Sequence, residues 1–171
     1  MSFPPIPAWD QLHPIAVHFP IALLLVTPVF LLATIVFRRD RKALARAAFV
    51  LMLLGTAGAW VAVSTGSAAE ELAEKTPGAH DILEKHEHLG GDVRVAFTFL
   101  TLGWAVFLVV PAVLRREVGT KVWAPATLAY LVLYMWGASV LANAAHEGGR
   151  LVHEAGVRAW AAGATEEHEE D

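Results

Sequence analysis

Two histidines lie at the start of the first long apolar stretch of this sequence. His13 and His18 belong to the run LHPIAVHFPI, which covers residues 12–21. A side chain that can ligate a metal or carry a proton is costly inside hydrocarbon, so histidines at this position indicate a functional role such as binding a metal or a proton. Neutral imidazole nitrogens are ligands for haem iron, copper and zinc. The question for the rest of the sequence is whether other ligands can meet these two.

The composition indicates a membrane protein. The chain has 171 residues, 56% of them hydrophobic, and a mean hydropathy of +0.48. This is too apolar for an ordinary soluble domain of the same length. The sequence has no cysteine, which excludes disulfides, iron–sulfur clusters, thiolate ligands and covalent c-type haem attachment.

Four apolar runs are long enough to cross a membrane. Each exceeds the roughly 20 residues that span about 30 Å of hydrocarbon, and in lipid each must be helical because its backbone polar groups find no water. We therefore predict an all-α, integral membrane four-helix bundle with up-down-up-down topology, a single domain over residues 1–160 and an acidic tail over residues 161–171. The predicted spans are about 14–37, 43–69, 93–114 and 122–145.

The distribution of charge predicts the orientation. The turn at residues 38–42, with Arg46 beyond it, and the turn at residues 115–121 hold eight basic residues, against the acids Asp40 and Glu117. The opposite side holds most of the acidic residues. The positive-inside rule then places both turns in the cytoplasm and both termini outside. For a bacterial chain this means the inner (cytoplasmic) membrane, with the other face towards the periplasm.

This topology gathers the histidines on one face. All eight fall on the predicted outer side. We predict His13, His18, His88 and His146 as cofactor-binding residues, with His86 as a further metal-ligand candidate. For each of them alone, a hydrogen bond to a neighbouring helix or a solvated position at the membrane interface is the competing interpretation. His80 and His168 are expected at the surface.

We predict a membrane-embedded electron-transfer protein that binds haem b at the histidine cluster near the outer surface, and two other functions stay open as alternatives. Bis-histidine haem b needs two histidines from different helices in an apolar pocket, which a transmembrane four-helix bundle provides. The expected axial pair is His18 with His88 or His146, and four histidines allow a second haem. A copper or zinc site could use the same residues. A structural accessory subunit of a respiratory complex, with hydrogen-bonding or pH-sensing histidines, is the third interpretation.

Motifs for other activities are missing from the sequence. His86-Glu87-His88 is not His-Glu-x-x-His, so it does not indicate a zinc hydrolase. No nucleophile–base pair, phosphate loop or nucleotide fingerprint is present, so we expect an electron-transfer or accessory protein rather than an autonomous enzyme. The expected partner is the lipid bilayer and not nucleic acid.

A resemblance supports the cofactor hypothesis. The motif at residues 12–21, together with Gly-Gly-x-Leu-Val at residues 148–152, resembles a bacterial four-helix membrane family of unknown function, over roughly residues 12–158. Family members are similar in having a histidine at the start of span three, matched by His88 (or His86), and often one before the glycine pair, matched by His146. Some members are joined to cytochrome c-like domains. The resemblance therefore implies electron transfer, with a periplasmic cytochrome c or another redox protein as partner.

The chain departs from the family pattern near its C-terminus. The family usually continues as Gly-Gly-x-Leu-Val-Tyr-x-His-Gly, whereas this sequence has His153 in place of the tyrosine and Ala155 in place of the histidine. A family role at these two positions does not carry over to this chain.

Overall fold

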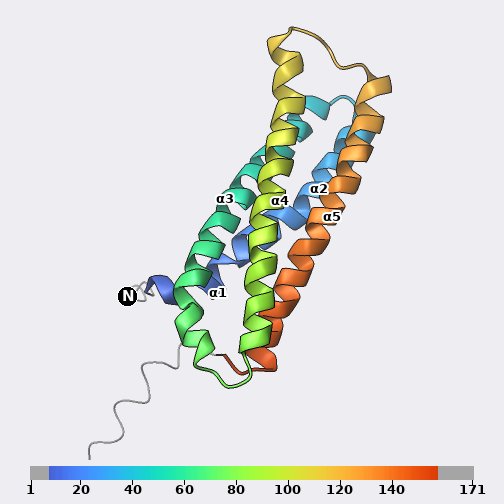
Figure 1. The fold of residues 1–171 in the computed structure, drawn as a ribbon. Coiled ribbons are helices and arrows are strands. Elements are labelled where there is room, and N and C mark those ends of the chain that lie inside the picture. The colour runs from blue at the N-terminus through green and yellow to red at the C-terminus, as the bar shows by residue number, and fades with distance from the viewer. Residues whose placement is uncertain (1–7, 158–171) are drawn as a thin grey trace, which may run out of the picture.

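Each long helix of this chain packs against the next one along the sequence. The computed structural model describes residues 8–157, and this part of the chain is helical throughout apart from short connections (Figure 1). Helix α2 packs on α3, α3 on α4, α4 on α5, and α5 closes the bundle against α2. The predicted up-down-up-down bundle is therefore confirmed. The elements are η1 (Trp9–Gln11), α1 (His13–Ala16), α2 (His18–Val36), α3 (Arg41–Glu74), α4 (His80–Val113) and α5 (Thr120–His153).

The first span is interrupted near its start. Pro14 occupies the first turn of α1, where a missing N–H costs nothing. Pro20 has no N–H to donate to the carbonyl of Ala16, and the helix breaks at Val17 between α1 and α2. The segment before this interruption carries His13 and packs against α3.

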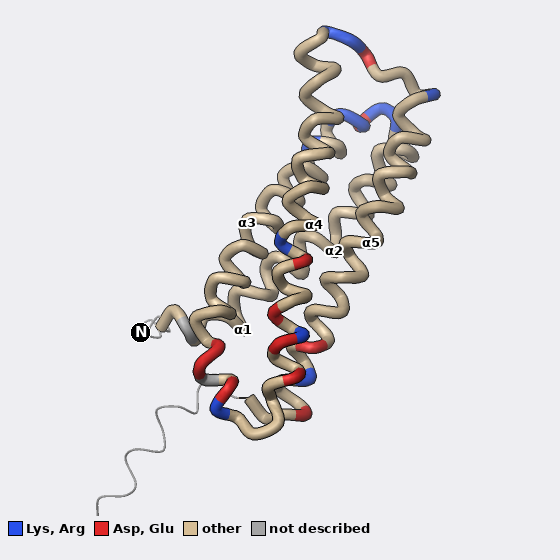
Figure 2. Tube along the Cα trace, viewed as in Figure 1, with Lys and Arg blue, Asp and Glu red and all other residues tan. Residues whose placement is uncertain are grey.

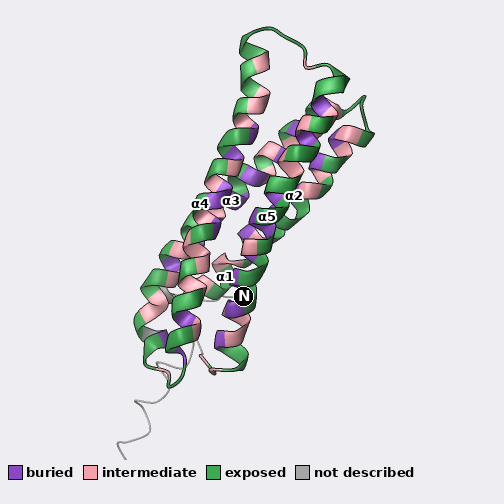
Figure 3. Ribbon diagram, turned by 45° about the vertical axis from the view of Figure 1, so that its right-hand side comes forward, coloured by how far each residue is buried: buried purple, intermediate pink, exposed green. Residues whose placement is uncertain are grey.

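The other three long helices extend well beyond a bilayer. α3, α4 and α5 have 34 residues each, or about 51 Å of helix against about 30 Å of hydrocarbon. On α4, large exposed apolar side chains begin at Val95 and continue to Leu114, whereas residues before Val95 are largely polar on the surface. We call the band of exposed apolar side chains on the four long helices the lipid belt. Exposed and buried residues alternate along these helices (Figure 3).

The part of the bundle beyond the lipid belt has its own small core. Leu83 of α4 and Leu151 of α5 pack with Ala73 and Ala79 around the α3–α4 turn, apart from the main core. Most of the sequence between the second and third predicted spans is helical. It forms the continuous ends of α3 and α4, and Gly90-Gly91 does not interrupt α4.

The two ends of the bundle carry opposite charge (Figure 2). The turns after α2 and α4 form the basic end, where Lys42 pairs with Glu117 at 2.6 Å and lowers the pKa of that carboxyl. The α3–α4 turn, the start of α1 and the end of α5 form the opposite, acidic end. The described chain therefore begins and finishes at the same end, as the predicted topology requires.

Within the lipid belt, buried polar side chains donate to backbone carbonyls of neighbouring helices. The Tyr134 hydroxyl on α5 donates to the Leu24 carbonyl on α2 at 2.8 Å, and Trp104 Nε1 on α4 donates to the Ala45 carbonyl on α3 at 3.1 Å. Gly55 on α3 allows Leu24 to approach closely, since an added Cβ would lie 2.7 Å from its side chain. Close backbone approach at small residues and interhelical hydrogen bonds are the usual means of packing helices in lipid.

Replacing Tyr134 by Phe tests this packing. The change removes only the hydroxyl and leaves the buried Leu24 carbonyl without this donor, so we expect the free energy of unfolding to fall by about 1 kcal/mol. Reversible unfolding in mixed micelles measures it. Val132→Ala is the control, because Val132 is 72% exposed on the lipid side and should lose much less stability. Equal losses in the two variants would contradict this account.

Candidate histidine pair at the acidic end

His13 and His86 meet at the edge of the lipid belt. The two rings come from α1 and α4 and lie with their centroids 5.9 Å apart, nearly perpendicular at 84°. Both side chains are partly buried. Two histidines 73 positions apart in the sequence thus face one another between four helical elements.

Each ring is held by a backbone carbonyl of another helix. His13 Nδ1 lies 2.8 Å from the Ala62 carbonyl oxygen on α3, and His86 Nδ1 lies 2.9 Å from the Ala144 carbonyl oxygen on α5. The first contact joins α1 to α3, and the second joins α4 to α5. In each case the histidine lies at the start of a helical hairpin and the carbonyl lies on the helix that returns beside it. The same arrangement is therefore built twice.

A glycine makes room for each ring. An added Cβ on Gly66 would lie 3.0 Å from His13 Cε1, and one on Gly148 would lie 2.9 Å from His86 Cε1. Gly66 lies four residues after Ala62, and Gly148 lies four residues after Ala144, so in each case the glycine is one helical turn beyond the accepting carbonyl. A Cβ at that position would collide with a ring bonded to the carbonyl.

The hydrogen bonds determine the protonation of the rings. A carbonyl oxygen can only accept, so Nδ1 of each neutral imidazole must carry the proton and Nε2 must carry a lone pair. Histidine ligands of metals typically donate the other ring N–H to a carbonyl or carboxylate, which fixes tautomer and orientation. Both rings therefore already have the tautomer and the fixed orientation that a metal-ligating imidazole needs.

The other candidate histidines lie apart from this pair. His18, His88 and His146 are exposed, and His88 Nδ1 lies 3.3 Å from Asp92 on the same helix. The structure does not bring these three together with each other or with His13. His80 and His153 are exposed as well, and His168 lies outside the described residues.

Some features of a larger metal site are missing here. Between residues 8 and 157, no three or more His, Asp or Glu side chains are placed to share one metal ion. Two grooves of about 530 and 390 Å³ lie elsewhere: one between α4 and α5, along Val95, Phe99 and Trp136, and one at the α4–α5 turn. The geometry of the pair thus provides two ligands.

The pair lies at the edge of the lipid belt. His13 bonds Ala62, which is inside the predicted second span and follows the exposed Val61, whereas His86 precedes the predicted third span. His86 is nine residues before Val95, where the lipid belt begins on α4, which corresponds to about 13 Å along the helix. Surface charge surrounds this level of the bundle, including an Arg150–Glu154 pair at 2.9 Å that lowers the pKa of Glu154. The site therefore has charged surface beside His86 and apolar surface beside His13.

Gly148→Ala tests the packing of the ring. The new Cβ must displace His86, so we expect the hydrogen bond to Ala144 to break and the free energy of unfolding to fall by about 1–3 kcal/mol. Gly149→Ala is the matched control, since an added Cβ there meets nothing within 4 Å. That variant should be neutral or slightly stabilised, because Ala is the better helix former. Chemical denaturation in detergent compares the two, and equal stabilities would contradict the proposed fit.

Comparison with known proteins identifies the family but no characterised relative. No curated protein and no solved structure matches the chain. Residues 10–161 match the family described as "Predicted membrane protein (DUF2231)". This match covers most of the chain, includes both members of the histidine pair and confirms the resemblance found in the two motifs. The chain belongs to the predicted membrane protein family DUF2231.

Proposed function

We propose that this protein is a membrane-embedded electron-transfer protein that binds haem b between His13 and His86. One observation carries the proposal. Two imidazoles from different elements each have Nδ1 committed to a backbone carbonyl, which leaves both Nε2 atoms free to bind a metal. We favour this pair over the axial ligands expected from the sequence, His18 with His88 or His146, because those three side chains are exposed.

The separation of the rings suits two ligands on one metal. Imidazole nitrogens bind metals at about 2 Å, so two nitrogens on opposite sides of an ion lie about 4 Å apart. Each ring centroid lies behind its nitrogen, and the observed 5.9 Å between centroids is of the size that this geometry requires. Apolar side chains such as Leu89 and Val93 pack near this level, and they would have to part to admit the macrocycle.

Haem iron would supply one-electron transfer at this position. His13 and His86 would hold the iron, and the carbonyls of Ala62 and Ala144 would keep each imidazole in the Nδ1–H tautomer. The surrounding apolar side chains would exclude water from the site.

Copper is the second candidate, favoured by a specific observation. The rings already stand close together, and neither groove noted above lies between them. A single copper ion would need less opening of the bundle than a porphyrin, and imidazole is a suitable ligand for it. Zinc is less well supported, because structural zinc takes four protein ligands and catalytic zinc three.

The proposed setting is the bacterial inner membrane with the acidic end towards the periplasm. The positive-inside rule favours this orientation, because the basic end carries most of the Lys and Arg residues. The histidine pair would then lie at the periplasmic edge of the lipid belt. A periplasmic cytochrome c or a similar soluble redox protein, especially a basic one, could reach it there.

Single histidine variants test the cofactor. Protein purified in mild detergent with haem supplied should show b-type Soret and α bands on reduction, with one iron per chain. We expect His13→Ala and His86→Ala to lose the low-spin spectrum, since each removes one axial ligand. The exposed residues provide matched controls: His18→Ala, His88→Ala and His146→Ala should keep it. Absorption spectra and elemental analysis for iron, copper and zinc make the comparison.

The possible results separate the candidates. Colourless protein with stoichiometric copper that is lost in the same two variants would replace haem by copper. Colourless, metal-free protein would favour the structural accessory subunit. Loss of haem in the His18, His88 or His146 variants but not in the His13 and His86 variants would overturn the assignment of the pair.

Cysteine labelling tests the orientation. The chain has no native cysteine, so Gly119→Cys at the basic end and Gly78→Cys at the acidic end each introduce one thiol, at positions with nothing within 4 Å of an added Cβ. Gly78 has φ of +80°, so any strain there stays in an exposed turn. In intact cells a membrane-impermeant maleimide should label the Gly78→Cys variant and not the Gly119→Cys variant. The opposite pattern would place the histidine pair in the cytoplasm.

A further inference from the structure

We propose that the ion pair between Lys85 and Glu147 positions the His86 ring, so that both are positioning residues of the site. The proposal rests on the function above only in taking His86 as a ligand. Its structural part, that the ion pair fixes the hydrogen bond and tautomer of His86, can be tested without any cofactor.

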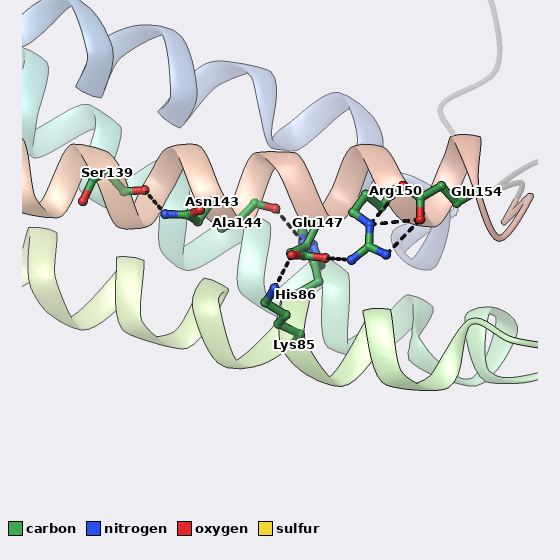
Figure 4. Close-up of polar contacts among 8 residues, drawn as sticks. All are labelled: Lys85, His86, Ser139, Asn143, Ala144, Glu147, Arg150 and Glu154. Atoms are coloured by element: carbon green, nitrogen blue, oxygen red, sulfur yellow. Dashed lines mark hydrogen bonds and ion pairs between the residues drawn. The ribbon is translucent and has the colours of Figure 1, made fainter.

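The Lys85–Glu147 ion pair joins α4 to α5 beside the His86 ring. Lys85 Nζ lies 2.5 Å from Glu147 Oε1, and Arg150 Nη1 lies 2.8 Å from Glu147 Oε2. The Glu147 side chain is only 5% exposed, whereas Lys85 is 61% exposed. Figure 4 shows Lys85 and His86 reaching from α4 to Glu147 and Ala144 on α5.

Burial of the carboxylate makes the contact obligatory. A carboxylate removed from water is strongly disfavoured unless cations and donors compensate it. Arg150 comes from the same helix as Glu147, and it also bonds Glu154. Among the described residues, Lys85 is the cation that Glu147 receives from another helix. Keeping Glu147 fully compensated therefore holds α4 against α5.

The ion pair holds α4 in the position along α5 at which His86 can bond the Ala144 carbonyl. Lys85 directly precedes His86, and Glu147 directly precedes Gly148, whose missing Cβ receives the ring. The hydrogen bond from His86 to Ala144 crosses the same helix interface. A slip of α4 along α5 would break the ion pair and the hydrogen bond together.

The other histidine gives an internal control. His13 bonds the Ala62 carbonyl, and Thr65 Oγ1 lies 3.4 Å from the same ring nitrogen. No ion pair in the described part of the chain joins α1 to α3. Loss of the Lys85–Glu147 contact should therefore change His86 and leave His13 as it is.

The test compares three lysine variants. Lys85→Met removes the charge, Lys85→Arg keeps it, and Lys42→Met removes the lysine of the exposed Lys42–Glu117 pair at the basic end. The full-length chain in detergent, without haem and with 15N-labelled histidine, reports the tautomer of each ring by NMR. His13→Ala and His86→Ala spectra assign the signals, and circular dichroism checks that each variant is folded.

We expect the wild type to hold both rings as Nδ1–H tautomers. In Lys85→Met, the ratio of Nδ1–H to Nε2–H at His86 should fall about fivefold, the equivalent of one hydrogen bond of about 1 kcal/mol. His13 should be unchanged, and Lys85→Arg and Lys42→Met should resemble the wild type. After haem loading, Lys85→Met should shift from a low-spin towards a high-spin spectrum, which Lys85→Arg should restore.

Each other result counts against the positioning role. An unchanged His86 tautomer in folded Lys85→Met would overturn it, as would equal changes at His13 and His86, since these would indicate general loosening. If Lys85→Met does not fold, the same comparison is made with Glu147→Gln, which keeps the shape and removes the charge. If Lys85→Met changes the His86 tautomer ratio as expected but the wild type takes up no haem, the proposed function is rejected and the positioning of His86 is supported.

Discussion

The acidic end of this bundle depends on an imidazole N–H donated to a helix carbonyl through the gap left by a glycine. It occurs where His13 meets α3 and again where His86 meets α5. In both cases the glycine follows the accepting residue by one turn, so a ring can reach a carbonyl that a Cβ would otherwise shield. Each hydrogen bond joins two helical elements, and the contact between the two rings joins the α1–α3 side of the bundle to the α4–α5 side. If the rings moved, α1 would lose its attachment to α3, and α4 would lose one of its attachments to α5.

The repetition suggests how one site can be made from two similar hairpins. The segment α1–α2 with α3 forms the first hairpin, and α4 with α5 forms the second, both starting at the acidic end. Each contributes one histidine from its first helical arm and one carbonyl–glycine notch from its second. A metal between two such ligands would be bound equivalently from both sides. The halves differ in what supports the ring. Among the residues whose side chains the structure describes, the second half alone has a buried carboxylate, Glu147, which a lysine of the facing helix compensates.

The fold could be predicted from the sequence to a greater extent than the site. Four apolar runs and two basic turns suffice for a four-helix membrane bundle, because hydrocarbon allows no other backbone arrangement for such runs. To choose which histidine of a helix belongs to the site, one must know which residues of that helix face the bundle and which face outwards. His86 and His88 are about 200° apart around α4, and both lie before the predicted start of the third span at residue 93, so the sequence did not show which of them faces the bundle. In the structure α4 is continuous, His86 faces the bundle and His88 faces out. Gly148 was a visible signal, but its meaning as a notch depends on a residue from another helix.

The length of the helices connects this site to its proposed work. A span needs only about 20 residues, yet α3, α4 and α5 each continue for a further three to four turns, with a second small core that keeps them together. Ordering this extra helix has an entropic cost that lipid does not offset, so the extension needs stabilising contacts of its own. The Ala73–Leu83–Leu151 cluster, the Lys85–Glu147 pair and the two histidine hydrogen bonds are such contacts. Together they hold two imidazoles in a fixed tautomer at the edge of the lipid belt, a position from which the proposed site could exchange electrons with a soluble protein.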